Sequence, residues 1–207
     1  MFPNESFGLT RSMMRSWEAL DPIRFKPAST ITSAFLRIQA EDFRSAAQYV
    51  SLLPYARNTH PDNPLVVLIE ERGTCSTKHA LLRRLAIEQN VDIALVLGIY
   101  EMSERNTPGV GNVLGRYGLA MLPEAHCYLR MAGSRIDVTP AIDQAPTERI
   151  SRFLYEEDID PSQITGYKTG LHKRFLAQWI IDNGGLGGRS LSDLWDIQEE
   201  CIARLSA

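Results

Sequence analysis

The stretch ERGTCSTKHALL, residues 71–82, places a cysteine where a tight turn passes into a helix. Gly73 marks the turn, and the apolar residues that follow recur at helical spacing. Thr74 or Gly73 is the expected helix cap, so Cys75 falls in the first turn. The free N–H groups and the positive dipole end of a helix favour an anion, which lowers the pKa of a thiol. Cys75 is therefore a candidate nucleophile, although a buried packing cysteine gives the same pattern.

A hairpin pattern follows further along the chain. Residues 122–131 alternate like a strand and contain His126. Residues 132–134, Ala-Gly-Ser, read as a turn, and residues 135–140 read as the returning strand, which contains Asp137. The pattern thus predicts a histidine on one strand and an aspartate on the next.

A thiol nucleophile needs a base, and the base needs a group that orients it. Cys75, His126 and Asp137 can fill these three roles if the hairpin places the last two on one face. Asp143 is an alternative orienting group, although it lies beyond the expected sheet. His79 is an alternative base, because it follows Cys75 by four residues and shares its helix face.

Three short motifs together resemble those of the transglutaminase-like superfamily, which has a papain-like cysteine-enzyme fold. They are Gly-Thr-Cys-Ser at 73–76, Glu-Ala-His at 124–126 and Arg-Ile-Asp-Val-Thr-Pro at 135–140. The resemblance covers residues 65–140, under half of the chain. This stretch contains no tryptophan, so an indole that stabilises the oxyanion in some family members has no match here.

The resemblance implies an enzyme that hydrolyses a peptide or amide bond, or transfers the acyl group to an amine. Cys75, His126 and Asp137 would form its triad, and it would need no cofactor and no metal. Its substrate would be a peptide, a protein or a small amide. The backbone N–H of Cys75 would be one oxyanion donor, and Asn63, in the turn before the helix, is our candidate for a second. The alternative is a non-catalytic member of the fold that binds a peptide or protein partner.

The other cysteines are expected in the core. Cys127 should face away from His126, because successive side chains on a strand alternate. Cys201 lies in an apolar helix pattern near the end of the chain. An odd number of cysteines does not suggest a disulfide framework and favours a reducing compartment. A zinc site built on Cys75 and His79 would lack the second ligand pair that such sites usually have.

Composition indicates an ordinary globular chain. Of its 207 residues, 44% are hydrophobic and 23% charged, and the formal net charge is −3. The charge does not point to nucleic acid or an anionic membrane, and no apolar run approaches the length of a membrane span. The N-terminus lacks the pattern of a signal peptide. We therefore expect a cytoplasmic protein.

We expect one domain over residues 1–207, with an α+β fold in which the cysteine helix packs on a mostly antiparallel sheet. An N-terminal helical segment (1–64) would precede the transglutaminase-like core (65–140), and C-terminal helices (141–207) would follow it.

Periodicity and end signals predict the individual elements. Helices are expected at 10–20, 41–53, 76–89, 168–183 and 191–205, and a buried strand at 91–102. Residues 31–39 fit either a helix or a strand. Residues 103–118 predict an exposed loop, and 184–188 a flexible joint. We expect the two C-terminal helices to pack on the core rather than to cap the cleft.

Overall fold

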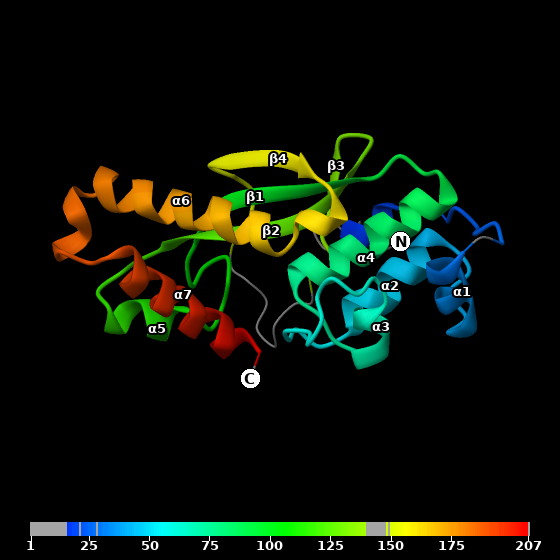
Figure 1. Cartoon of the computed structure of the whole chain (residues 1–207), viewed down its shortest axis with the longest axis horizontal. Helices are drawn as coiled ribbons and strands as arrows, with labels where there is room; N and C mark the ends of the chain where they lie inside the picture. Colours follow the sequence, from blue (N-terminus) through cyan, green and yellow to red (C-terminus); the bar gives the residue numbers. More distant parts are fainter. Residues whose placement is uncertain (1–15, 21, 28, 140–147, 149, 207) are drawn as a thin grey trace, which may run out of the picture.

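The computed structural model describes residues 16–206, apart from 21, 28, 140–147 and 149. Within that part, seven α-helices accompany an open antiparallel sheet of four strands (Figure 1). The expected α+β class with an antiparallel sheet is confirmed. The strands lie in the order β3-β2-β1-β4, with β1 at Ala94–Met102, β2 at Leu122–Met131, β3 at Ser134–Ile136 and β4 at Tyr155–Ile159.

A β2–β3 hairpin forms where the sequence predicts it, but β3 ends at Ile136, so the expected strand at 135–140 is too long and Asp137 lies just beyond it. Ala132 and Gly133 form its turn with φ of 47° and 77°, values that suit glycine and strain alanine. β3 pairs only with residues 129–131 of β2. The rest of this edge of β2 pairs with none of the described strands. Pro123 is tolerated in β2 because an open edge requires no ladder hydrogen bond.

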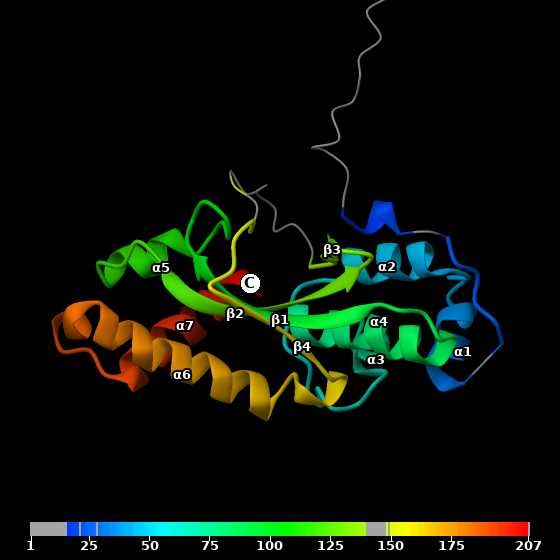
Figure 2. The ribbon, with the colours of Figure 1, turned by 90° about the horizontal axis from the view of Figure 1, so that it is seen from above.

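Four helices pack at one end of the sheet (Figure 2). They are α1 Thr30–Arg37, α2 Phe43–Leu52, α3 Val66–Glu70 and α4 Cys75–Gln89. Thr74 is the N-cap of α4, and its N–H donates to Thr77 Oγ1 at 3.0 Å. The buried Lys78 donates from Nζ to the carbonyl of Leu53 at 2.5 Å, which ties α4 to the end of α2. The main core between these helices and the sheet includes Phe35, Phe43, Leu81, Leu85, Leu97 and Leu129.

Three helices pack at the other end of the sheet (Figure 2). They are α5 Gly111–Arg116, α6 Gly166–Asp182 and α7 Leu191–Leu205. Ser190 caps α7 with Asp193 as the pattern indicates, and the Asp193 N–H donates to Ser190 Oγ at 3.2 Å. A second core joins these helices to the sheet through Met102, Leu122, Leu176 and Leu194.

Two expectations about local structure are wrong. Residues 103–118 are not an exposed loop throughout, because they contain α5, whose Val113 and Leu114 are buried against the second core. Strand β4 was missed altogether. Its sequence, Tyr-Glu-Glu-Asp-Ile, lacks the apolar alternation that marks a strand, since it forms the edge of the sheet and most of it is exposed.

The remaining local predictions have mixed outcomes. Residues 31–39 are resolved in favour of a helix, and the 184–188 joint contains a short 3-10 turn at Gly184–Gly187. Of the helix expected at 10–20, a 3-10 turn at Ser16–Ala19 is described, and the preceding residues lie outside the described part. Asp143 also lies outside it. Helix α6 packs on β2 as expected, and both α6 and α7 also line the cavity described below.

Candidate functional site

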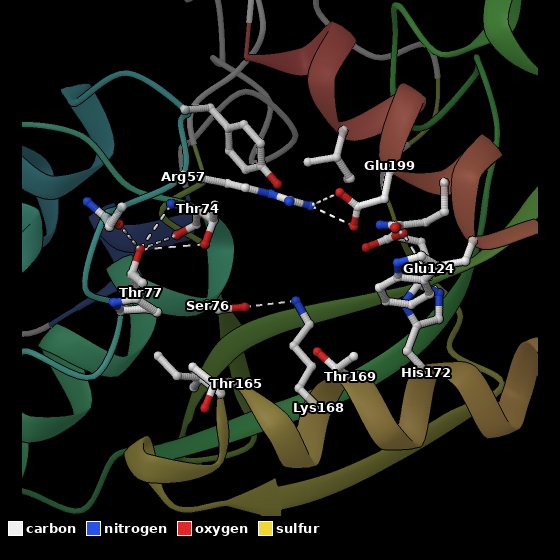
Figure 3. Close-up of a pocket in the computed structure, with 17 residues that line it drawn as sticks. Arg57, Thr74, Ser76, Thr77, Glu124, Thr165, Lys168, Thr169, His172 and Glu199 are labelled. Carbon is white, nitrogen blue, oxygen red and sulfur yellow. Dashed lines mark hydrogen bonds and ion pairs between the residues drawn. The ribbon is translucent and has the colours of Figure 1, made fainter. Parts of the chain in front are cut away.

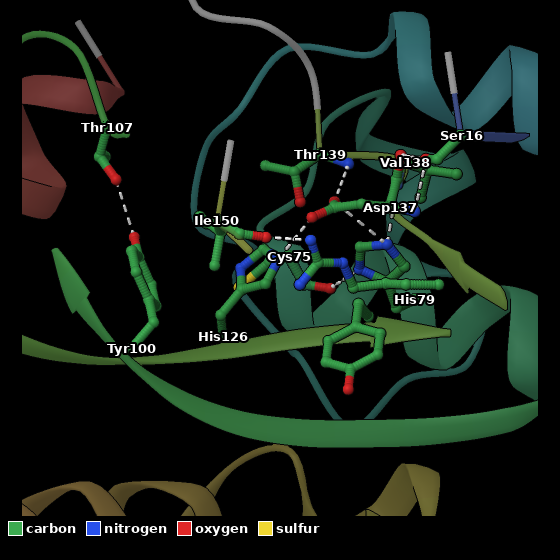
Figure 4. Close-up of polar contacts among 12 residues, drawn as sticks. Ser16, Cys75, His79, Tyr100, Thr107, His126, Asp137, Val138, Thr139 and Ile150 are labelled. Atoms are coloured by element: carbon green, nitrogen blue, oxygen red, sulfur yellow. Dashed lines mark hydrogen bonds and ion pairs between the residues drawn. The ribbon is translucent and has the colours of Figure 1, made fainter. Parts of the chain in front are cut away.

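Three elements bring Cys75, His126 and Asp137 together (Figure 4). Cys75 is the first residue of α4, His126 lies in the middle of β2, and Asp137 follows β3 directly. His126 Nε2 donates to Asp137 Oδ2 at 2.7 Å. The His126 and Cys75 side chains lie close enough for each to shift the pKa of the other. Since Nε2 is bound to the carboxylate of Asp137, Nδ1 is the ring nitrogen that remains to exchange a proton with Cys75 Sγ.

Asp137 is held from several directions. Its Oδ1 accepts the backbone N–H of Thr139 at 2.9 Å, and its own N–H donates to Ser16 Oγ at 2.8 Å. Ser16 Oγ in turn donates to the carbonyl of Asp137 at 2.9 Å. Burial raises the pKa of Asp137, but its contacts with His126 outweigh this and hold the pKa well below its usual range. The group that orients the histidine is therefore ionised and fixed.

The electrostatics favour an ion pair between Cys75 and His126. Burial would raise the pKa of Cys75, but the charges of Lys168 and His126 lower it to about 6. Burial would lower the pKa of His126, but Asp137 and then Cys75 raise it to about 10. At neutral pH the pair is therefore thiolate and imidazolium, the form in which cysteine is nucleophilic.

Lys168, on α6, is a second cationic partner of the thiolate that the sequence did not reveal. Its Nζ donates to Ser76 Oγ at 2.8 Å and lies 3.8 Å from Cys75 Sγ. The backbone N–H of Cys127, on the open edge of β2, also hydrogen-bonds the sulfur and lowers its pKa. The thiolate thus meets Lys168, His126 and a backbone N–H.

His79, the alternative base, has both ring nitrogens bound to backbone groups. Its Nδ1 donates to the carbonyl of Cys75 at 2.7 Å, and its Nε2 accepts the N–H of Val138 at 2.9 Å. This pattern requires the neutral Nδ1–H tautomer. Burial lowers the pKa of His79 to about 4. His79 therefore has no free nitrogen for the thiol and joins α4 to the segment that carries Asp137.

Gly98 allows an aromatic wall to form beside His126. It lies opposite His126 in the β1–β2 ladder, and a Cβ there would come within 2.4 Å of the Phe153 ring. Phe153 stacks on Tyr128 with 5.3 Å between centroids, and Tyr100 contacts the imidazole edge-on at 6.0 Å. This wall shields one side of the imidazole from water.

The structure does not bring Asn63 to the site. Its side chain is exposed, and Oδ1 accepts the N–H of Leu65 at 3.0 Å, so it shapes the turn before α3. Tyr55 lies nearer to the thiol. A parallel bridge pairs it with Gly73, and burial followed by the charge of Cys75 raises its pKa well above the usual value. Its hydroxyl has no hydrogen-bond partner among the described residues, which leaves it free to donate to a ligand.

The two other cysteines lie in the core, as the sequence predicts. Cys127 and Cys201 are fully buried and free. Burial raises the pKa of Cys127 to about 11 and that of Cys201 to about 12. No cluster of metal-ligating side chains occurs among the residues that the structure describes, so the zinc alternative gains no support.

A cavity of about 360 Å³ opens beside Thr74 and Ser76, the two neighbours of Cys75 in the chain (Figure 3). It lies between the start of α4, the facing sides of α6 and α7, and the segment around residues 55–61. An ion pair between Arg57 and Glu199, 2.7 Å long, crosses from that segment to α7. The polar side chains that line the cavity include Tyr55, Ser76, Glu124, Lys168, Gln198 and Glu199.

Comparisons with protein-family models, with curated proteins and with solved structures find no match to this chain. None of the described helices is both long and apolar enough to span a membrane.

Proposed function

We propose that this protein is a cysteine-dependent acyl-transfer enzyme of transglutaminase-like type with a papain-like core. Its substrate contains a peptide or amide bond. The observation that carries the proposal is the arrangement of three groups beside a cavity: Asp137 binds His126, and His126 and Lys168 lower the pKa of Cys75 at the start of α4. Nucleophile, base and orienting group in this order are what thiol catalysis needs.

The reaction follows from the charges of these groups. The Cys75 thiolate attacks the carbonyl carbon, and the carbonyl electrons move onto oxygen. His126 then protonates the leaving amine while the C–N bond breaks, which leaves a thioester on Cys75. Water or a second amine, deprotonated by His126, attacks the thioester and releases the thiol. No cofactor enters these steps.

The oxyanion needs donors that exist before the reaction. The backbone N–H of Cys75 is the first in α4 and has no intrahelical acceptor. The Tyr55 hydroxyl is the second donor, because it lies in the cavity and has no partner among the described side chains and backbone groups. It takes the role that Asn63 was expected to have.

A non-catalytic, peptide-binding domain is the second candidate. It is favoured by the low exposure of Cys75, whose surface is only 5% accessible. Thiol chemistry separates the two, because an inert buried cysteine does not react rapidly near neutral pH.

The test is iodoacetamide labelling of the native protein with peptide mapping. Cys75 should react first, with a rate that rises through an inflection near pH 6, as the lowered pKa requires. Incubation with a nitrophenyl ester should then leave an acyl group on Cys75 and none on the Cys75→Ala variant. Labelling confined to Cys127 or Cys201, or no acylation despite a reactive thiol, would contradict the proposal.

A further inference from the structure

The cavity contains a buried carboxylate that has no close lysine or arginine partner among the described residues. Glu124 lies on β2 and is only 7% exposed. Its Oε2 accepts from Gln198 Nε2 at 2.9 Å and lies 3.9 Å from His172 Nε2. That histidine nitrogen already donates to the carbonyl of Pro123 at 2.8 Å. No lysine or arginine of the described chain forms an ion pair with Glu124.

The second oxygen of Glu124 is open to the cavity. Oε1 has no hydrogen-bond partner in the described part of the chain. Oε1 is not fully buried, unlike Thr139 Oγ1 and Gln198 Oε1, the two described side-chain atoms that are fully buried without a partner. Because Glu124 lines the cavity, Oε1 faces that space. Gln198, whose Nε2 donates to Glu124, has a fully buried Oε1 that also lacks a partner.

The other charged groups of the cavity have partners. Lys168 lies beside the Cys75 sulfur, and Arg57 pairs with Glu199. The charges of Lys168 and Arg57 reach Glu124 only at longer range, so Glu124 lacks a close cation of its own among these groups. A carboxylate removed from water is costly unless it is paired. A ligand that brings a positive charge would remove that cost.

We infer that Glu124 forms a subsite for a primary ammonium group on the substrate, which anchors the substrate while Cys75 reacts elsewhere on it. The inference rests on the proposed function and names the substrate class. Glu124 and His126 are two residues apart on β2 and share one face. Their Cα atoms are therefore separated by about 7 Å along the strand. At that separation the cation cannot be the group attacked at Cys75. It is a remote recognition group, several bonds from the reacting carbonyl.

Two chloroacetamides of matched length test the inference. One carries an aminobutyl chain on nitrogen and the other an uncharged pentyl chain. In both, the Cys75 thiolate forms the C–S bond while the C–Cl bond breaks and chloride leaves. The cationic reagent should react at least about tenfold faster at low concentration. Its ammonium group can form a charge-assisted hydrogen bond with Glu124, and such bonds are stronger than neutral hydrogen bonds. In Glu124→Gln the ratio of the cationic rate to the neutral rate should fall to about twofold or less.

The variants are chosen to keep the fold. A glutamine at 124 can still accept from Gln198 Nε2, so packing is preserved. Glu200→Gln is the matched control, because Glu200 lies on α7 next to Glu199 but pairs with Arg116 on α5. It should keep the full cationic preference. An equal loss of preference in both variants would overturn the subsite in favour of a general surface charge effect.

The experiment separates the two proposals. If the neutral reagent labels Cys75 and the cationic one has no advantage, the subsite is wrong and the enzyme proposal stands. If neither reagent labels Cys75, the enzyme proposal fails, and equilibrium binding of pentylammonium chloride decides the subsite. Binding measured by calorimetry that is lost in Glu124→Gln and absent for pentanol supports the subsite. No binding, or binding unchanged in Glu124→Gln, overturns it.

Discussion

The N–H of Val138 donates to Nε2 of His79 at 2.9 Å, and this bond connects the segment after the hairpin to the helix of the nucleophile. The other nitrogen of His79 donates to the carbonyl of Cys75. One neutral imidazole thus spans the backbone at Cys75 and the residue that follows Asp137. The relative position of nucleophile and orienting carboxylate depends on this link.

His79→Ala should destabilise the protein without removing the base. The variant leaves the buried N–H of Val138 without an acceptor and opens a cavity. We therefore expect a loss of about 1–3 kcal/mol in the free energy of unfolding. Urea unfolding measures this loss. The inflection in the pH profile of Cys75 alkylation should move little. A shift of that inflection to the free-thiol value would mean that His79 acts as the base.

His126→Ala should raise the pKa of Cys75. The imidazolium lowers that pKa through its charge, which the variant removes. The inflection of alkylation should move from near 6 toward the free-thiol value of about 8.5. The measurement is the iodoacetamide rate between pH 5 and 9, taken on protein shown by circular dichroism to be folded. An unchanged inflection would remove His126 from the role of base.

Lys168→Met should also raise the pKa of Cys75, because the Lys168 charge is the largest influence that lowers it. Lys168→Arg keeps the charge and should keep most of the effect. Lys173→Met is the control on the same helix, since Lys173 Nζ lies over the Trp195 ring at 4.5 Å and away from the sulfur. Equal pH profiles for Lys168→Met and Lys173→Met would show that Lys168 does not tune the thiol.

Local sequence signals revealed the main parts of the site. Cys75 was readable because a cap and a helix period surround it, and the hairpin of His126 and Asp137 was readable from alternation and a glycine turn. Each of these signals lies within about ten residues. These local signals predicted that a cysteine, a histidine and an aspartate lie close together, and the structure gives the distances between their atoms.

The parts that were missed depend on long-range contacts. Lys168 meets Ser76 across 92 positions of sequence, and a lysine on an amphipathic helix ordinarily faces water. Tyr55 is placed by its bridge to Gly73, and no local pattern marks a parallel bridge of this kind. Strand β4 is defined by pairing with β1 rather than by its own acidic residues. Tertiary context overrides propensity in such segments.

The pH dependence of stability should reveal the Cys75–His126 ion pair. The folded pKa of His126, about 10, exceeds its unfolded value of about 6.5, so its contribution is lost as pH rises from 6.5 to 10. The folded pKa of Cys75, about 6, is below its unfolded value of about 8.5, so its contribution grows as pH rises between these values. From pH 6.5 to 8.5 the two trends oppose each other, and the pair binds one proton in both states.

The wild-type protein should therefore keep a nearly constant urea midpoint between pH 6.5 and 8.5. In Cys75→Ala the opposing trend is gone, while Asp137 still raises the pKa of His126. The midpoint of that variant should fall steadily across the same window. Parallel curves for the two proteins would show that Cys75 and His126 do not share a proton in the folded state.

Tyr55→Phe should slow acyl transfer and leave alkylation unchanged. Attack on an ester carbonyl builds negative charge on oxygen, which the Tyr55 hydroxyl would stabilise, whereas displacement of iodide from iodoacetamide builds none there. Loss of one oxyanion donor commonly costs a factor of about 10² to 10³. We expect a loss of that order in the rate of Cys75 acylation by a nitrophenyl ester, followed by mass spectrometry. Tyr167→Phe is the control, because Tyr167 is exposed on α6 and donates to Glu157. A variant in which both reactions slow equally would indicate that Tyr55 positions the thiol, and one in which neither changes would remove Tyr55 from the oxyanion site.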